Sequence, residues 1–336
     1  MTKFRAMVVL TAVISASPIV CKADPFGAAS AYNLFAVGST TMAGTINDSA
    51  DVQGRIAAAS TISGTFTLAA GLQSDPWGAD ATVGGVTYDF VAGGGYTSGI
   101  SNINGANGSA YKTSGSGAFN FNGGGHLVGS GPVPIDFNTL RTQLDAETIY
   151  LGTLGANGTI IGTGNGNGGN PSWYVIKATQ PGLNVFTISA AILASNQIDI
   201  VTTDPSQTIL INVLDSGTVT VGQSLLLNGN QYFNDEHTSK ILINAPNATN
   251  FVGNAEVDSS VLAPFALITG GDFDGNVIGA AIGATGEIHN IEFDGTIPSP
   301  PTTPPVPEPG TLALVGTGVL SVATAVRRKK KAIAQS

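Results

Sequence analysis

Cysteine is almost absent from this chain, which has a single one at Cys21. That residue lies in an N-terminal segment where Lys3 and Arg5 precede an apolar stretch at 6–20, and small residues follow as in a cleavage site. We therefore predict a signal peptide over residues 1–23 and a mature chain without cysteine. In an oxidising compartment such a chain has neither disulfides nor a thiolate nucleophile, so packing and backbone pairing must stabilise it.

Basic side chains are also scarce once the two ends of the chain are set aside. Eight of the 13 Lys and Arg residues lie before position 24 or after position 326. Residues 24–309 hold all 22 acidic residues and only five basic ones, which gives a formal net charge of −17. The five are isolated from one another: Arg55, Lys112, Arg141, Lys177 and Lys240. A surface that binds a polyanion needs clustered Lys and Arg, so nucleic acid is not an expected partner.

Catalytic and zinc-binding motifs are missing as well. The histidines His126, His237 and His289 are more than fifty residues apart, and no His-x-x-x-His or His-Glu-x-x-His pattern occurs. His289 lies near Glu287 and Asn290, which allows a catalytic dyad, but a structural role is favoured because a general base also needs a partner and a cleft. His237 lies in a polar segment and is interpreted as part of a solvated turn. We therefore predict that the protein is not an enzyme.

One pair of carboxylates is a candidate for holding a cation. Asp272 and Asp274 alternate before Gly275, as at the start of a calcium loop, but no bidentate Glu follows at the required distance. An Asp-Gly turn between two strands is the favoured alternative. We expect no cofactor, and Ca²⁺ at these two aspartates is the metal site that the sequence leaves open.

A long apolar run is present only near each end of the chain, and the one near the C-terminus has a distinctive setting. It spans the 17 residues 310–326, near the lower limit of roughly 17 to 25 for a helix that crosses a bilayer. A short motif precedes it and a basic cluster follows it: Val306-Pro307-Glu308-Pro309 and Arg327-Arg328-Lys329-Lys330-Lys331. The basic cluster favours a cytoplasmic C-terminus, with the rest of the chain outside.

This tail resembles the PEP-CTERM sorting signal of Gram-negative bacteria. The resemblance implies processing by an exosortase near the Pro-Glu-Pro element, after transient attachment to the inner membrane through a transmembrane helix. A plain single-pass membrane anchor is the alternative on length and charge alone.

Glycine is abundant, with 45 residues, and short apolar segments between turn residues recur along the body of the chain. We predict strands at 34–37, 40–43, 51–57, 64–68, 184–189, 206–213, 218–221, 240–243, 261–268, 276–282 and 287–293. Many short strands are compatible with a sandwich, a barrel or a solenoid. Small residues at the corners, with Val, Ile and Leu pointing inward, favour an all-β solenoid of stacked coils, although no exact repeat period is present.

One segment has helical periodicity instead. Between Asp136 and Leu151 the residues Phe137, Leu140, Leu144, Thr148 and Leu151 recur at helical spacing. Asp136 is placed to cap the helix, and Gly152 follows its predicted end. We expect this single sizeable helix to lie against the flank of the coils, with Arg141, Asp145 and Glu147 facing water.

Two groups of motifs resemble the choice-of-anchor A family. They are the opening segments 31–38 and 51–58 and the closing segments 241–244, 260–264, 275–279, 286–290 and 293–295. Together they bracket about 270 residues. The resemblance implies an adhesive surface domain. The Val261-Leu262-Ala263-Pro264 block is similar to the β-solenoids of bacterial ice-binding proteins, which implies a right-handed β-helix with a flanking α-helix. The Gly-Asn tract at 162–170 departs from the pattern and is interpreted as a flexible insertion.

The predicted layout has four parts: a signal peptide at 1–23, a β-solenoid domain at 24–296, a Pro-rich linker at 297–305 and the sorting signal at 306–331. Export through the inner membrane and delivery to the outer surface follow from the two terminal signals.

The expected function is that of a secreted, non-catalytic adhesive or structural protein of the cell surface or extracellular matrix, associated with exopolysaccharide or biofilm. One alternative is a carbohydrate-active enzyme, a glycoside hydrolase or polysaccharide lyase, on the same scaffold. Another is an ice- or surface-binding protein, for which only short pieces such as Thr218-Val219-Thr220 provide the threonine array. Most of the aromatic residues between 71 and 125 are expected in the core rather than on a sugar-binding surface.

Overall fold

The protein is described by a computed structural model that covers residues 25–69, 81–129, 131–163, 170–231 and 235–301. The chain divides into two units, Met1–Ser299 and Pro300–Ser336, and the fold given below is that of the first. The predicted signal peptide, the Val306–Pro309 motif and the segment at 310–331 lie outside the described residues. Within the described ranges, no helix is long and apolar enough to cross a bilayer.

Short parallel strands make up most of the fold. The first half contains η1 (Gly27–Ala31), β1 (Leu34–Ala36), β2 (Ile46–Asn47), β3 (Asp51–Val52), β4 (Ile56–Ala58), β5 (Thr61–Ser63), β6 (Thr67–Leu68), β7 (Thr82–Val83), β8 (Val86–Ala92), β9 (Gly95–Tyr96), β10 (Ile100–Ile103), β11 (Ser109–Lys112), β12 (Ala118–Phe121) and β13 (Leu127–Val128). The second half contains α1 (Phe137–Thr153), β14 (Thr159–Thr163), β15 (Tyr174–Lys177), β16 (Leu183–Thr187), α2 (Ala190–Ser195), β17 (Ile198–Val201), β18 (Thr208–Asn212), β19 (Gly217–Val221), β20 (Leu226–Leu227), α3 (Asp235–Thr238), β21 (Ile241–Asn244), β22 (Ala248–Gly253), β23 (Ser260–Gly270), β24 (Phe273–Asp274), β25 (Val277–Ile282) and β26 (Ile288–His289).

The strands form stacked coils with three walls. Consecutive strands of a coil belong to different walls and pair in parallel with strands of neighbouring coils, except that β7 and β14 pair antiparallel with the strands that follow them, β8 and β15. The main path of a 16-stranded sheet, β13-β11-β8-β4-β1-β25-β23-β21-β18-β16, is the helix-covered face. A branch of the same sheet through β9, β5, β2, β25, β23, β22 and β19 is called the uncharged face below. A six-stranded sheet, β12-β10-β6-β3-β26-β24, is called the acidic face, and β14-β15-β17-β20 form a further sheet.

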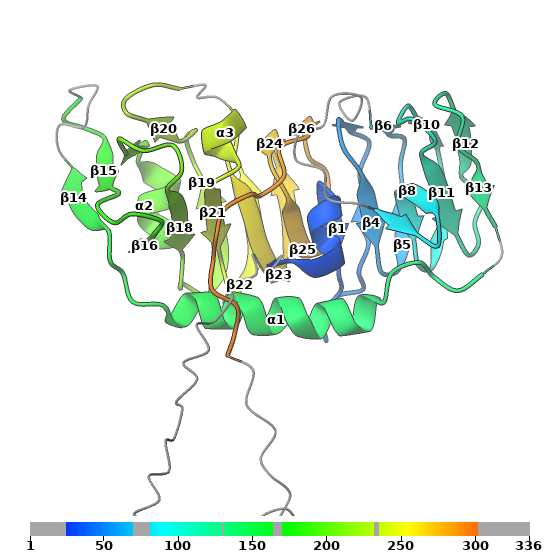
Figure 1. Ribbon diagram of the computed structural model, residues 1–336, viewed down its shortest axis with the longest axis horizontal. Coiled ribbons are helices and arrows are strands. Elements are labelled where there is room, and N and C mark those ends of the chain that lie inside the picture. Colours follow the sequence, from blue (N-terminus) through cyan, green and yellow to red (C-terminus); the bar gives the residue numbers. More distant parts are fainter. Residues whose placement is uncertain (1–24, 70–80, 130, 164–169, 232–234, 302–336) are drawn as a thin grey trace, which may run out of the picture. The chain divides into compact units, whose positions relative to one another are not determined.

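The first and last coils of the chain meet in the middle of the stack. β1 lies between β4 and β25, with Leu34 in register with both Ile56 and Val277. The chain therefore builds outward from the centre to β13, crosses along α1, and returns from β16 to β25 (Figure 1). The expected all-β class and parallel stacking are confirmed by these sheets, whereas the right-handed sense of the coils stays a prediction.

Helix α1 confirms the predicted helix and corrects it at two points. Asp136 caps the N-terminus by accepting a hydrogen bond from the Thr139 amide at 3.1 Å. The prediction that Glu147 faces water is wrong, because Glu147 is only 2% exposed. It lies seven residues after Leu140, on the same stripe as the apolar side chains. The helix also continues through Gly152 to Thr153 rather than ending before the glycine.

Two groups of contacts hold α1 on the helix-covered face, which it crosses along the stack (Figure 1). Apolar side chains of the helix and of the strands share one buried cluster, which includes Leu140, Leu144, Leu151, Phe35, Val91, Leu210, Leu242 and Leu262. At the C-terminal end of the helix, Asn212 donates to the Leu151 carbonyl at 2.8 Å and Asn244 donates to the Thr148 carbonyl at 3.0 Å. The two asparagines are in register and bond each other at 2.8 Å, so neighbouring strands add side-chain donors to two carbonyls near the C-terminal end of the helix.

The interior of the coils is a second, separate apolar cluster of Ile, Val, Leu, Phe and small residues. Aromatic residues fill it near β8 and β9, where the Phe90 and Tyr96 rings lie 4.9 Å apart and Phe119 packs against both. Tyr88 and Tyr111 are also buried, so the expectation that most aromatics of this region lie in the core is confirmed for the described residues.

Several predicted strands differ from the observed ones for local reasons. Residues 40–43 form no strand, because the Ser39 hydroxyl accepts hydrogen bonds from the amides of Thr41 and Met42 and closes a turn. The predicted strand at 51–57 is split into β3 and β4 by a corner at Gly54, where a side chain would meet the Asn33 amide oxygen at 1.5 Å. The strand expected at 287–293 is reduced to β26.

Candidate functional site

The uncharged face presents two rows of small or neutral side chains in register across the coils. Its inward positions are fully buried and include Val219, Phe251, Ile268, Ile282, Ile46, Ile62 and Tyr96. Because side chains alternate along a strand, the positions on either side point outward. One outward row is Thr218, Asn250, Leu267, Ala281, Thr45, Thr61 and Gly95, and the other is Thr220, Val252, Thr269, Gly283, Asn47, Ser63 and Thr97. None of these positions carries a charge.

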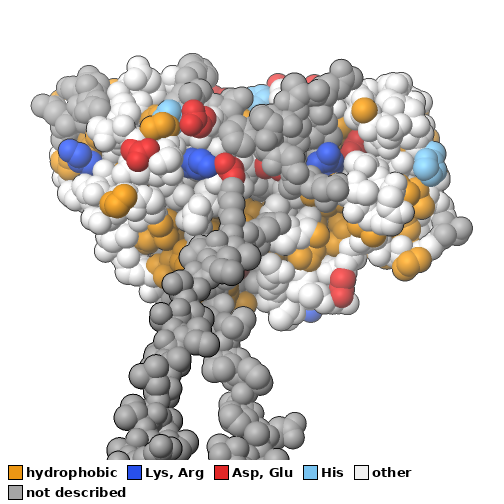
Figure 2. All heavy atoms as spheres, in the orientation of Figure 1, with side chains coloured by type: hydrophobic (Ala, Val, Ile, Leu, Met, Phe, Trp, Pro, Cys, Tyr) orange, Lys and Arg blue, Asp and Glu red, His pale blue; other side chains and the backbone are white. Residues whose placement is uncertain are grey.

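The threonines of this face do not form a regular array. Thr218 and Thr220 pair in register with Asn250 and Val252 rather than with further threonines. Hydroxyl, amide, aliphatic and glycine positions therefore follow one another in no fixed order along each row, and Thr45 and Thr61 are the threonines on adjacent coils. In the view of Figure 2, uncharged side chains cover most of the surface, and the charged ones lie singly or in small groups among them.

The acidic face is built in the same way but changes character along its length. Around β10 and β12 it carries asparagines in register, and Asn120 donates to the Asn102 side chain at 2.9 Å. The pair Asn122 and Asn104 repeats this bond at 2.7 Å. Thr67 of β6 continues the first row. At this end the face is polar and neutral.

Toward β3, β26 and β24 the same rows become acidic. Asp51 is in register with Thr67, and the pairing of Val52 with Ile288 places Glu287 beside Asp51. Gln53 donates to the Glu287 carboxylate at 2.9 Å. The register continues from Ile288 to Phe273 and, through an isolated bridge, from Phe273 to Val257, which brings the side chains flanking Val257 onto the same wall.

Glu256, Asp274 and His289 converge at this end, and we call them the His289 triad. One ligand-type atom from each lies within 4.8 Å of the other two. The His289 ring contacts Asp274 directly through Nδ1, and its Nε2 lies 3.7 Å from the Glu287 carboxylate. All three side chains are half-buried.

The carboxylates around His289 set its protonation. The hydrogen bond with Asp274, followed by the charges of Asp274, Glu287 and Glu256, raises the pKa of the His289 imidazole to about 9. Burial, followed by the charges of Glu256 and Asp274, raises the pKa of Asp258 to about 7. The imidazole is therefore a cation near neutral pH. The carboxylates around it, Glu256, Asp274 and Glu287, lie close enough to repel one another.

Residues 25–290 match the model of the family described as "Putative Ice-binding-like adhesive domain". The chain belongs to this family. The match covers the coils, α1 and both lateral faces, so the predicted membership of an adhesive surface family is confirmed. Residues 305–329 match the PEP-CTERM protein-sorting motif, which confirms the predicted sorting signal and implies processing by an exosortase. Together the adhesive domain and the motif indicate an exported surface protein.

Solved structures similar to this adhesive domain are ice-binding proteins. One, from the Antarctic ascomycete Antarctomyces psychrotrophicus, is 11% identical with a TM-score of 0.37, and the match covers 79% of this chain and 97% of that one. Another, a glycosylated ice-binding protein from an Arctic yeast, is 14% identical with a TM-score of 0.36 over 83% and 97% of the two chains. A domain from Shewanella frigidimarina is 14% identical with a TM-score of 0.29 over 80% and 95%. No curated protein sequence matches the chain.

The site residues expected from sequence are distributed unevenly over the adhesive domain. Of the two predicted metal-binding aspartates, Asp274 lies in the His289 triad, whereas the Asp272 carboxylate accepts a hydrogen bond from the Glu287 amide at 2.7 Å. His126 is exposed beside β13 and lies in a different part of the fold. The sorting residues Val306–Pro309 and the basic residues Arg327–Lys331 lie outside the described ones.

Glu256 was not expected as a site residue. Register pairs Val257 with Phe273, 16 positions later, and Asp274 with His289, 15 positions later, so Glu256 lies one coil from Asp274 and is offset from it along the strand. The coil length would have revealed the convergence, but the sequence has no fixed period from which to read it.

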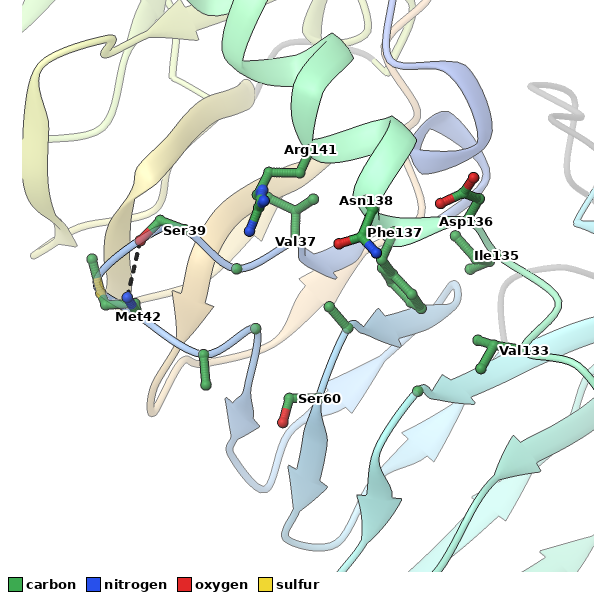
Figure 3. A pocket seen from close by; sticks show the side chains of 15 residues that line it. Val37, Ser39, Met42, Ser60, Val133, Ile135, Asp136, Phe137, Asn138 and Arg141 are labelled. Carbon is green, nitrogen blue, oxygen red and sulfur yellow. Dashed lines mark hydrogen bonds between the residues drawn. The ribbon is translucent and has the colours of Figure 1, made fainter.

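A groove of about 350 Å³ lies elsewhere, where the N-terminal end of α1 meets the corners of the central coils. Figure 3 shows Asn138 and Arg141 from the helix on one side, and Ser39 and Met42 from the turn after β1 on the other. Asp136 is its single acidic lining residue. A hydrolase that uses two carboxylates across a sugar would need a second one here.

Proposed function

We propose that this adhesive domain is a secreted, non-catalytic surface or matrix protein that attaches to exopolysaccharide through its uncharged face. The observation that carries the proposal is the pair of outward rows on that face, which extend without a charge across the coils from β19 to β9. The PEP-CTERM motif supports delivery to the cell surface. The layout that we propose is a signal peptide at 1–23, a right-handed β-helix at 24–296, a linker at 297–305 and a transmembrane sorting segment within 306–331.

A rigid neutral face is suited to binding an extended polymer. Thr, Ser and Asn offer hydroxyl and amide groups, while Val, Leu and Ala cover the remaining area between them. Because the backbone is already ordered by pairing between coils, attachment requires little loss of conformational entropy. Many weak contacts repeated along the coils add up when the ligand is itself repetitive. Absence of charge removes the desolvation penalty of ionic groups and predicts binding that depends little on salt.

The electrostatics of the His289 triad support a non-catalytic role. A general base must be unprotonated near the working pH, whereas the carboxylates hold the His289 imidazole in its charged form up to a pKa of about 9. Asp274, which contacts the ring, serves as the partner of that cation.

Binding to a panel of bacterial exopolysaccharides tests the proposal. Thr218→Tyr and Asn250→Tyr place neutral bulk in one outward row, on adjacent coils. We expect each to weaken binding at least roughly tenfold, about 1.4 kcal/mol, because the polymer can no longer lie along the face. Ala146→Tyr is the matched control, since Ala146 is exposed on α1 and distant from the two rows in the fold. Unchanged binding by both face variants, or equal loss by the control, would refute attachment through this face.

Ice binding is a second candidate, favoured by the threonines Thr218, Thr220 and Thr269 of the same face and by the family's description. Measuring growth of ice crystals in the presence of the wild type and of Thr218→Tyr separates the two. Inhibition of ice growth that the substitution abolishes, with no polysaccharide bound, would replace the first proposal.

A carbohydrate-active enzyme is the remaining candidate, because acidic residues do converge on the acidic face. Incubating the same polysaccharides with the wild type and with Asp274→Asn tests it. Release of reducing ends or of unsaturated sugars by the wild type alone would establish catalysis and remove the adhesive interpretation.

A further inference from the structure

The His289 triad combines one imidazole and two carboxylates from three consecutive segments of the coil stack. Their ligand-type atoms lie within 4.8 Å of one another. Side chains of these types at such separations are the first requirement of a site for a borderline divalent cation, which is bound by His nitrogen together with Asp or Glu oxygen.

Backbone pairing places the three residues. Asp274 of β24 is in register with His289 of β26. The Asp274 amide donates to the Val257 carbonyl at 3.0 Å, and the Val257 amide donates to the Asp272 carbonyl at 2.9 Å, so Glu256 directly precedes a residue that is fixed against β24. Positions held by sheet register need little reorganisation on binding a ligand.

Carboxylates outnumber positively charged groups around the triad, and this excess of negative charge favours binding of a cation. Glu287 lies 3.7 Å from the other nitrogen of the His289 ring. Asp258, only 3% exposed, and Asp51 belong to the same wall. The charged groups that act on Glu256 are Asp274, Asp272 and His289, and those that act on Asp258 are Glu256 and Asp274. One imidazole therefore faces several carboxylates, and like charges side by side on a sheet are destabilising.

We propose that Glu256, Asp274 and His289 bind one divalent transition-metal cation on the acidic face, and that Zn²⁺ fits the ligand set best. A neutral imidazole with two carboxylates balances the charge of the ion, and three protein ligands leave a coordination position for water. Ca²⁺ is disfavoured because it takes six to eight oxygen ligands and the triad provides a nitrogen. The site therefore differs from the calcium loop that Asp272 and Asp274 suggest by their spacing. It lies on a different wall from the uncharged face, so metal binding and attachment to polysaccharide are tested separately.

Titration of the metal-free full-length protein with Zn²⁺ alone, by calorimetry and by metal analysis after dialysis, tests the proposal. We expect one Zn²⁺ per chain and a melting temperature that rises with the Zn²⁺ concentration. Glu256→Gln and His289→Gln each remove one ligand and should weaken Zn²⁺ binding by a factor of roughly 100 or more. Ca²⁺ at the same concentrations should give no comparable stabilisation.

His126→Gln is the matched control, since His126 is exposed and lies near β13 rather than in the triad. It should bind Zn²⁺ as the wild type does. Circular dichroism of the metal-free variants checks that they fold. If His289→Gln proves unstable, Glu256→Gln alone tests the proposal, because Glu256 lies between strands and its substitution should not disturb the sheet. Absence of saturable Zn²⁺ binding, binding retained in Glu256→Gln, or binding lost in His126→Gln would each overturn the proposal.

Discussion

The uncharged face and the acidic face are made by the same backbone and differ only in which side chains the coils align. On both, parallel pairing places residues of neighbouring coils in register and so aligns their outward side chains in rows. On the uncharged face these rows contain Thr, Asn, Ser and small apolar residues. On the acidic face it places Asp51 beside Glu287 and both near His289. Aligning side chains in register therefore has no electrostatic cost on the uncharged face, whereas on the acidic face it brings negative charges together.

This difference shows where binding functions are expected. A row of neutral side chains adds no electrostatic strain, so it can extend as far as the coils do and present a broad surface. A row of carboxylates is unfavourable on its own and requires a positive partner at the same place. The fold therefore supplies an extended contact surface on one wall and a localised cation-binding position on another.

The largest expected effect comes from weakening the packing of α1 on the helix-covered face, because the strands of that wall belong to the same coils as both other faces. Leu144 of α1 is fully buried against the helix-covered face, and Leu144→Ala should lower the free energy of unfolding by about 3–5 kcal/mol through lost contacts and a cavity. Thermal and denaturant unfolding measure it. Ile149→Ala is the control, because Ile149 of the same helix is 54% exposed and its loss should change stability by less than about 0.5 kcal/mol. Equal effects of the two would mean that α1 is not packed as described.

The next effect concerns the corner that joins the two faces. Gly64 lies between β5 and β6 with φ of 120°, and a side chain there would meet the Asp48 carbonyl oxygen of the neighbouring coil at 1.4 Å. Gly64→Ala should destabilise by roughly 2–4 kcal/mol, from positive φ and overpacking together. Gly84→Ala separates the two causes, since Gly84 has φ of 59° and nothing within 4 Å of the added carbon. It should cost roughly 1–2 kcal/mol. If the two alanine variants melt alike, the corner is not closely packed.

A third prediction concerns the pH dependence of stability, and it depends on Glu147, a buried acid of α1 that does not belong to the acidic face. Burial raises the pKa of Glu147 from 4.5 to about 7, and its Oε1 has no hydrogen-bond partner among the described residues. The unfolded chain therefore ionises Glu147 more readily than the folded one, so stability falls as pH rises from about 4.5 to about 7 and is level beyond. Glu147→Gln should remove this part of the pH dependence and raise stability above pH 7 by about 2–3 kcal/mol, with little change at pH 4.

Unfolding midpoints measured across this pH range check the prediction. Glu236→Gln is the control because Glu236 is exposed, and its curve should follow that of the wild type. A Glu147→Gln curve with the wild-type slope would assign the pH dependence to other groups.

The smallest effects compare the two ends of the acidic face and have opposite signs. Asp51→Asn removes a negative charge beside Glu287 and should raise the free energy of unfolding by roughly 0.2–1 kcal/mol in metal-free protein. Asn120→Ala removes the bond from Asn120 to Asn102 at the neutral end and should lower it by a similar amount. Differential scanning calorimetry with a chelator present can resolve the two. Destabilisation by Asp51→Asn would show that the charge there is already compensated.

The sequence predicted those parts of the fold that depend on neighbouring residues. The periodicity of Phe137, Leu140 and Leu144 located α1, and the β-branched runs of the second half located β18, β21, β23 and β25. The turn after Ser39 was missed because a single hydroxyl accepts two amides there, which overrides the strand propensity of Thr40 and Thr41.

Features that depend on distant residues were not predictable in the same way. The pairing of β1 with β25 joins segments at opposite ends of the domain, and no sequence signal marks it. Asp274 was a candidate from its local spacing, but its contact with His289 and its proximity to Glu256 depend on coil lengths that the sequence does not repeat. Glu147 was misplaced because its charge was given more weight than its position on the helical stripe.

The central position of β25 affects how the domain resists force. β25 is the last long strand of the domain. It has β23 on one side and β1 on the other, so it is not an edge strand. Tension that reaches this strand from the C-terminal side must break the hydrogen bonds to two neighbours together, in shear, instead of peeling a terminal strand one bond at a time. A tether attached at this point would therefore load the middle of the stack, where mechanical unfolding is hardest to initiate.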